Sequence, residues 1–324
     1  MVEKKTVQTY CVKNEIPELI SLLKNEDSED IYYSRYKKRF IDREKMQYDI
    51  NNPLLVAILH EYEEYYISVF YDRVPLKKAN KNLKLGLCKT LKTHKLTMLF
   101  LEKHIKKVFE EAGYHFLGHT TSGYYGPYIW TKTEEVKYSI ELPNGKVDLP
   151  VLFMYDFLMN SWLEYVSFGE IGTGGWSKEE GLYCIYDRYK DVIEEPKFKV
   201  SYLIHEAQHN IDMKNKKYNM SASLLEYRAK LAELTNYPNM ELFQNFLTRA
   251  KNDKKLSHPL AEYWVISDLS KLIFNEEYVN DIKQWESKLN DIQTNSSELL
   301  FNYNRCKKNV LTGTISYYLK ALFA

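Results

Sequence analysis

The sequence lacks the segments that would place the protein in a membrane or send it through the secretory pathway. Residues 1–14 are polar and contain no apolar stretch of the kind that a secretory signal peptide carries. No run of about 18 apolar residues occurs, which argues against a transmembrane helix. We therefore expect a cytoplasmic protein without a membrane partner, although signal-independent export is compatible with the same sequence.

Cysteine is scarce, and neither sign of charge is in excess. The four cysteines, Cys11, Cys88, Cys184 and Cys306, lie far apart and form neither a C-x-x-C motif nor a disulfide framework, which is typical of a reducing compartment. Lys and Arg number 45 against 44 Asp and Glu, so the net charge is +1. This balance gives no reason to expect a nucleic acid or an anionic membrane as partner.

Two common catalytic patterns are also missing. The chain has no Gly-x-Ser-x-Gly sequence and no plausible Cys–His pair, so serine or cysteine nucleophile chemistry is not supported. The glycine-rich segment 169–176 is not a phosphate-binding loop, because no Gly-Lys-Ser/Thr follows it. It is either a turn or a backbone segment that a substrate chain approaches closely.

Hydrophobic spacing predicts helices in the first third of the chain and strands after it. Apolar residues recur at helical spacing over 54–70 and over 87–112, and Gly113 is expected to end the second helix. Segments 125–132, 136–142 and 182–186 are rich in aromatic and β-branched residues, and the second alternates apolar with polar side chains. These features predict strands.

The segment after the second strand has two interpretations. Asn144-Gly145 can close a β-hairpin. Alternatively, the chain turns into a helix over 151–165, with Asp148 as its cap and Pro150 in its first turn. We favour the helix because this stretch is long and apolar.

Together these patterns predict an α+β protein that is mainly helical. We expect a helical N-terminal region over 1–112 and a second domain over 113–324. Within that domain, a small twisted sheet over 120–190 is followed by two helices over 199–237 and by a helical C-terminal part over 240–324.

The most specific motif is His205-Glu206-Ala207-Gln208-His209, an H-E-x-x-H sequence in a segment predicted to be helical. Histidines four positions apart lie about 40° apart around a helix axis, so both imidazoles can reach one metal ion. Glu206 points beside this pair. Two imidazole ligands with an adjacent carboxylate indicate a catalytic Zn²⁺ site, in which Glu206 is the general base for a metal-activated water.

A catalytic zinc site usually needs a third protein ligand, and three carboxylates compete for that role. Glu226 and Glu233 are seven residues apart and so share one face of the helix predicted over 221–236. Apolar neighbours suggest that Glu226 is buried. A bound metal ion would offset the free-energy cost of burying its negative charge. Asp212 shares the helix of His209 and fits better as an acceptor for an imidazole N–H. We rank Glu226 first, Glu233 second and Asp212 third.

The oxyanion of a tetrahedral intermediate needs a hydrogen-bond donor besides the metal. His258 and Tyr263 are the candidates, and we assign the role to His258. A structural role at the start of a helix, before Pro259, is equally compatible with this position. His115 and His119 are also four residues apart, but glycines flank them and no acid accompanies them. We expect these two to be ordinary histidines.

The motif and its downstream glutamate resemble the gluzincin group of the zincin metallopeptidases, to which the thermolysin-like enzymes belong. The resemblance covers about residues 120–240. It implies that His205 and His209 are zinc ligands, that Glu226 is the third ligand and that Glu206 is the catalytic base. It also implies that a glycine-containing edge strand within 172–186 pairs with an extended peptide substrate.

The sequence departs from the gluzincin pattern in the surroundings of the ligands. Lys230 stands where the thermolysin-like enzymes have an aspartate, so the groups that support the ligands must differ. The extended metzincin motif is absent, since Asn215 stands where its third ligand belongs. The flanking phrases also resemble those of poorly described bacterial HExxH proteins, a resemblance that implies no substrate.

These observations predict a zinc metallopeptidase that hydrolyses a peptide or protein substrate. The alternative is a zinc-binding regulatory or interaction module on the same scaffold, with little or no turnover. The sequence leaves the cleavage specificity and the oligomeric state open.

Overall fold

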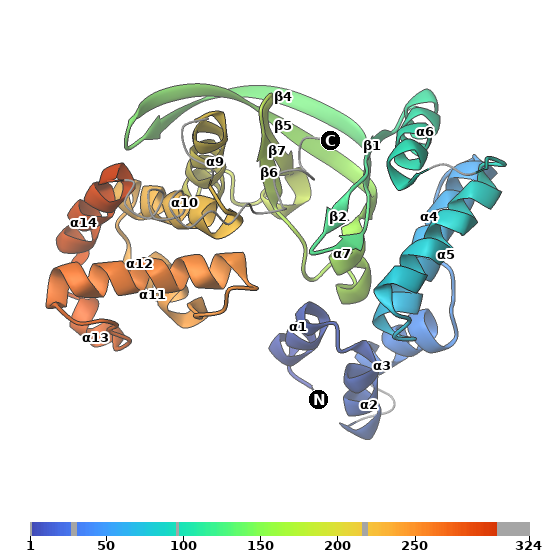
Figure 1. Cartoon of the computed structure of the whole chain (residues 1–324), viewed down its shortest axis with the longest axis horizontal. Helices are drawn as coiled ribbons and strands as arrows, with labels where there is room; N and C mark the ends of the chain where they lie inside the picture. The colour runs from blue at the N-terminus through green and yellow to red at the C-terminus, as the bar shows by residue number, and fades with distance from the viewer. Residues whose placement is uncertain (1, 27–30, 95–96, 216–219, 303–324) are drawn as a thin grey trace. The chain divides into compact units, whose positions relative to one another are not determined.

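The computed structural model describes residues 2–26, 31–94, 97–215 and 220–302. The chain divides into two compact units (Figure 1). Unit 1 comprises Met1–Thr133 and Met154–Thr173, and unit 2 comprises Glu134–Phe153 and Gly174–Ala324. The boundary expected after residue 112 therefore lies inside unit 1. Helices predominate and are accompanied by a sheet, which agrees with the predicted α+β class.

Helices make up most of unit 1. They are α1 (Lys4–Lys13), α2 (Ile16–Glu26), α3 (Ile31–Tyr36), the π-helix η1 (Lys37–Ile41), α4 (Pro53–Phe70), α5 (Leu76–Thr90), α6 (Met98–Glu111) and α7 (Ser161–Ser167). The core of the unit is aromatic. Phe70 of α4 stacks on Trp162 of α7 with 4.9 Å between ring centroids, and Tyr66 lies 5.0 Å from Tyr165. This packing gives the tyrosine-rich α4 a structural role.

The single helix expected over 87–112 is wrong, because two helices occupy this region. Helix α5 ends at Thr90, and Lys92 has a left-handed backbone with φ 50°. Helix α6 starts afresh at Met98, where the Thr97 side chain accepts a hydrogen bond from the Phe100 amide. The predicted end is confirmed, since Gly113 follows α6 with φ 85°.

A five-stranded sheet has the order β1-β4-β5-β7-β6 (Figure 1). Its strands are β1 (His115–Leu117), β4 (Tyr128–Leu142), β5 (Gly145–Asn160), β6 (Gly175–Lys178) and β7 (Gly181–Ile185). A separate pair is formed by β2 (Thr120–Thr121) and β3 (Tyr124–Tyr125). Strand β1 pairs antiparallel with β4, and β6 pairs antiparallel with β7. The last pairing leaves β6 as the outermost strand on its side of the sheet.

The helix expected over 151–165 is also wrong. Strand β5 runs to Asn160, and α7 starts only at Ser161. Only Pro143 and Asn144 separate β5 from β4, its neighbour in the sheet, so the hairpin alternative is the one that the structure adopts. The prediction failed because a strand with both faces partly covered has a nearly continuous apolar sequence, which periodicity alone cannot distinguish from a buried helix.

Unit 2 is helical after its strands. Its helices are η2 (Tyr186–Arg188), α8 (Pro196–Phe198), the π-helix η3 (Lys199–Ile204), α9 (His205–Lys214), α10 (Ala222–Asn236), α11 (Met240–Arg249), α12 (Ser257–Phe274), α13 (Ile282–Trp285) and α14 (Leu289–Asn302). The predicted helix over 221–236 is confirmed as α10, whose first turn is capped by the Ser221 hydroxyl. Within the described residues, no helix is both long and apolar enough to cross a membrane.

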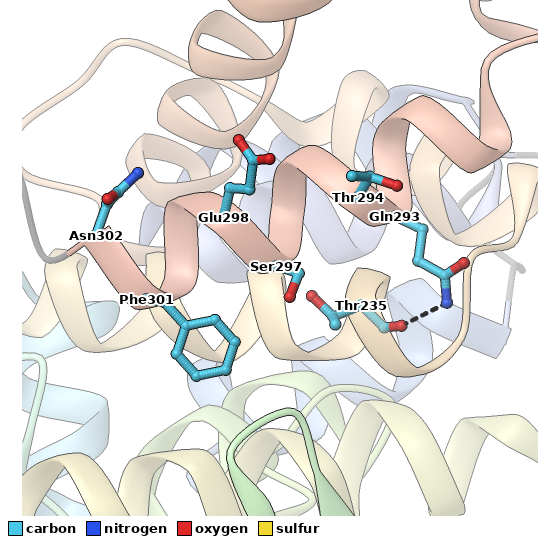
Figure 2. Close-up of a pocket in the computed structure, with 7 residues that line it drawn as sticks. All are labelled: Thr235, Gln293, Thr294, Ser297, Glu298, Phe301 and Asn302. Carbon is cyan, nitrogen blue, oxygen red and sulfur yellow. Dashed lines mark hydrogen bonds between the residues drawn. The ribbon is translucent and has the colours of Figure 1, made fainter.

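Helix α10 lies at the centre of unit 2, against α9, α12 and α14. Its buried Arg228 forms an ion pair of 2.8 Å with Asp212 of α9 and donates a second hydrogen bond to the carbonyl of Leu300 on α14. At its end, the Thr235 carbonyl accepts a 2.8 Å hydrogen bond from Gln293 of α14. Figure 2 shows this last contact in a mostly polar pocket of about 710 Å³ along α14.

The glycine-rich segment permits close packing at the start of β6. A Cβ on Gly175 would come within 2.1 Å of the Tyr183 carbonyl oxygen and 2.7 Å of the Tyr202 ring. A Cβ on Gly174 would meet the Tyr189 hydroxyl at 2.1 Å. Part of the segment is thus required by contacts inside unit 2, which is a structural reason for glycine at these two positions.

We predict that Gly175→Ala lowers the free energy of unfolding by about 2–3 kcal/mol, because the rigid carbonyl of Tyr183 leaves no room for the methyl group. Denaturant unfolding of the full chain measures the change. Ser177→Ala in the same strand is the control, since the buried Ser177 hydroxyl has no hydrogen-bond partner among the described residues. It should shift stability by no more than about 0.5 kcal/mol. Equal effects of the two changes would contradict the packing argument.

Glu102 of α6 provides a pH-dependent prediction. Burial against Gly118 raises the pKa of Glu102 from 4.5 to about 7. A carboxyl with a raised pKa in the folded state destabilises the fold once it ionises, so the loss develops as pH rises from 4.5 through 7.

We expect Glu102→Gln to raise the free energy of unfolding by about 2–3 kcal/mol at pH 8 and to change it little at pH 4. Denaturant unfolding at both pH values measures this difference. Glu110→Gln, an exposed change on the same helix, should have no effect at either pH. A gain for Glu102→Gln that is equal at both pH values would rule out ionisation as its cause.

Candidate metal centre

The H-E-x-x-H motif occupies the start of α9, directly after the π-helix η3. Isolated π-helical turns within helices are frequent at functional sites. His205 is buried and His209 is nearly so, with 12% of its side chain exposed. Their ring centroids are 4.6 Å apart and the ring planes are nearly perpendicular. The four-residue spacing therefore places both imidazoles together, as the sequence predicts.

Helix α10 brings Glu226 to the two histidines. One carboxylate oxygen of Glu226 lies 3.3 Å from His205 Nε2, and the other lies 3.4 Å from His209 Nε2. One ligand atom from each of the three residues lies within 4.8 Å of the others, so the group could hold a metal ion. The structure thus unites the two histidines with the carboxylate that the sequence ranked first.

Glu233, ranked second, contacts the opposite side of one imidazole. Its carboxylate lies 2.7 Å from His205 Nδ1, and both groups are buried. While Nδ1 donates its proton to Glu233, a metal ion would take the place of the proton that Nε2 shares with Glu226. A carboxylate that orients a histidine in this way is the usual outer partner of a metal-binding imidazole.

Asp212, ranked third, is turned toward another group. Its carboxylate pairs with Arg228 rather than with an imidazole. Lys230, which departs from the gluzincin pattern, likewise lies in a separate ion pair, with its Nζ 3.1 Å from Glu262. The outer carboxylate of this centre is therefore Glu233, one helical turn beyond Lys230.

The charges at this centre favour a cation. Burial by itself would lower the pKa of His205, but hydrogen bonds with Glu226 and Glu233 raise it from 6.5 to about 10. Burial would raise the pKa of Glu226, yet hydrogen bonds from His205, His209 and His258 hold it well below 4.5. Two imidazoles and a carboxylate are a donor set that binds divalent metal ions, so the residues could hold such an ion.

The predicted base, Glu206, is half-buried next to the ligands along α9. Burial raises the pKa of Cys184 and Tyr189, and the negative charge of Glu206 contributes to both shifts. The Glu206 carboxylate therefore lies near Cys184 of β7 and near Tyr189.

The two candidates for oxyanion stabilisation differ in position. His258, at the start of α12, has Nδ1 2.8 Å from a carboxylate oxygen of Glu226, and 63% of its side chain is exposed. Tyr263 stacks on Tyr278, with 5.0 Å between centroids. Of the two, His258 is the residue that contacts the group that could hold a metal ion. His115, expected to be ordinary, stacks on Trp130 in unit 1.

The outermost strand is tied to the motif helix. The buried side chain of Asn210, next to His209, donates a 2.6 Å hydrogen bond to the Lys178 carbonyl at the end of β6. Sequence reasoning missed this contact, although an amide buried beside a ligand is the kind of signal that could have found it. It also missed the Arg228–Asp212 pair, which fixes α9 to α10.

Comparisons with models of protein families, with curated proteins and with solved structures found no match.

We predict that Glu233→Gln weakens zinc binding about 10- to 100-fold, because the amide no longer fixes the orientation and basicity of His205. Competition with a fluorescent chelator measures the affinity. Glu241→Gln on the exposed face of α11 removes the same charge and should leave the affinity unchanged. Affinity that is unaltered by Glu233→Gln would remove this residue from the centre.

Proposed function

We propose that the chain is a zinc-dependent metallopeptidase of gluzincin type. The observation that carries the proposal is the convergence of His205, His209 and Glu226 from two helices, next to Glu206. No fourth His, Cys, Asp or Glu joins this group among the described residues. A catalytic zinc site usually has three protein ligands and leaves one coordination position for water, whereas a structural zinc site has four protein ligands.

Each residue has a distinct chemical role in this proposal. A zinc ion bound by the three ligands would polarise the scissile carbonyl and lower the pKa of a water molecule. Glu206 would accept the proton of that water and pass it to the nitrogen of the leaving amine. His258, whose Nδ1 lies 2.8 Å from Glu226, would donate a hydrogen bond to the developing oxyanion from its other ring nitrogen.

In this proposal, the outermost strand β6 would pair with an extended peptide. It is tethered to the motif helix through Asn210, so a substrate strand paired with β6 would run close to the proposed metal ligands. Backbone hydrogen bonds of this kind bind peptides with little dependence on their side chains. We therefore infer a peptide or unfolded protein segment as the substrate.

Glu206→Gln tests the proposed base. We expect it to retain about one equivalent of zinc and to lower kcat for peptide cleavage by about 100- to 10,000-fold, because the amide cannot take up a proton. Cleavage of a peptide library, followed by mass spectrometry, and elemental analysis of the same samples measure both quantities.

Two controls separate the proposal from its alternatives. Cleavage by the unaltered chain should stop with a chelator and return with zinc. Retained zinc with undiminished cleavage by Glu206→Gln would contradict the base assignment. Zinc without any cleavage by the unaltered chain would instead support a regulatory or interaction module on this scaffold.

A further inference from the structure

Unit 1 contains a second cavity whose chemistry differs from that of the metal centre. It has a volume of about 320 Å³, within the range of small-molecule sites. Its wall comes from η1 with the end of α3, from the loop that follows, and from the junction of β5 with α7. All of the residues that line it belong to unit 1.

Two arginines on one side of the cavity are held by aromatic faces. The guanidinium carbon of Arg39 lies 3.7 Å from the ring centroid of Phe168 and 4.6 Å from that of Tyr165. The guanidinium carbon of Arg35 lies 4.4 Å from the same Phe168 ring. One N–H of Arg39 donates to the Tyr165 carbonyl. Stacking positions both cations while leaving most of their N–H donors available.

Neither arginine forms an ion pair with a carboxylate in the part of the chain that the structure describes. The nearby Glu63 is buried, and it accepts hydrogen bonds from the Tyr48 hydroxyl and the Met46 amide. Burial raises the pKa of Glu63, and the positive charge of Arg39 opposes this shift, so Glu63 acts on Arg39 as a nearby charge without a direct ion pair. Among the described residues, neither guanidinium group is therefore neutralised by a direct ion pair.

The rest of the wall is largely aromatic and apolar, and its polar members are Asn160, Ser161 and the carboxylate of Glu164. Tyr48, Tyr165, Phe157 and Phe168 line the cavity together with methionine and leucine side chains. The buried Tyr165 hydroxyl and the Asn160 side-chain oxygen have no hydrogen-bond partner among the described residues. The amide of Asn160 donates 2.6 Å to Glu164, the carboxylate that lines the cavity.

The backbone around the cavity is strained. Ser161 and Phe168, neither of them glycine, have left-handed backbones with φ of 62° and 54°. Phe168 in this conformation ends α7 and holds the ring on which both arginines stack. Backbone strain of this kind persists where the surroundings hold it in place, and it is frequent at ligand sites.

We propose that this cavity binds a small organic anion with an aromatic or apolar body. Its carboxylate or phosphate would take hydrogen bonds from Arg35 and Arg39, in the bidentate geometry that guanidinium groups favour. Its body would lie against the tyrosine and phenylalanine side chains. The inference does not depend on the metal centre or on peptidase activity.

The test uses the full chain and three probes: naphthoate, the neutral naphthamide of the same shape, and phenyl phosphate. Saturation-transfer NMR detects binding, and titration gives the dissociation constants. We expect naphthoate and phenyl phosphate to bind, and naphthamide to bind at least tenfold more weakly than naphthoate. Naphthamide that binds as tightly as naphthoate, or no binding of either anion, would overturn the proposal.

Arg35→Gln and Lys38→Gln form a matched pair of variants. Both remove one positive charge from the same segment, but only Arg35 lines the cavity, whereas Lys38 is exposed outside it. Arg35→Gln should weaken naphthoate binding at least fivefold, and Lys38→Gln should leave it unchanged. Equal binding to both variants would show that the guanidinium of Arg35 does not recognise the anion. Melting temperatures confirm that both variants are folded.

Discussion

The packing of α9 against α10 is the constraint on which the candidate metal centre depends. The two histidines lie on one helix and Glu226 on the other, so a small rotation of either helix would separate the ligands. The buried pair of Asp212 and Arg228 opposes such a rotation, because breaking it would leave an unpaired charge in the interior. Arg228 also holds the carbonyl of Leu300, which extends this restraint to α14.

The charges of the centre follow from the same packing. Glu226 and Glu233 lie on one face of α10, one against Nε2 and the other against Nδ1 of His205. This buried imidazole carries a proton over a wide pH range because two carboxylates face it. A divalent cation at Nε2 of His205 would replace the single positive charge of the proton there with a charge of +2. Glu233 would still accept the hydrogen bond from Nδ1. The arrangement thus fixes the orientation of the His205 ring toward the position of a metal ion.

The sequence predicted the parts of the protein that depend on local spacing. The histidine pair, the helix carrying Glu226 and the strand near Leu182 could all be found from periodicity and motif. The sequence did not reveal that β5 continues to Asn160, because an apolar run fits a buried strand and a buried helix equally well. Nor did it show that Asp212 would pair with Arg228, since a contact between two helices has no local pattern.

X-ray absorption spectroscopy of the zinc-loaded full chain tests the central claim most directly, because it reports the atoms bound to the metal. We predict two imidazole nitrogens, one carboxylate oxygen and one water oxygen, all at about 2.0–2.2 Å. The imidazole signal should fall by half in His209→Gln. A sulfur ligand, or a spectrum unchanged by His209→Gln, would contradict the account.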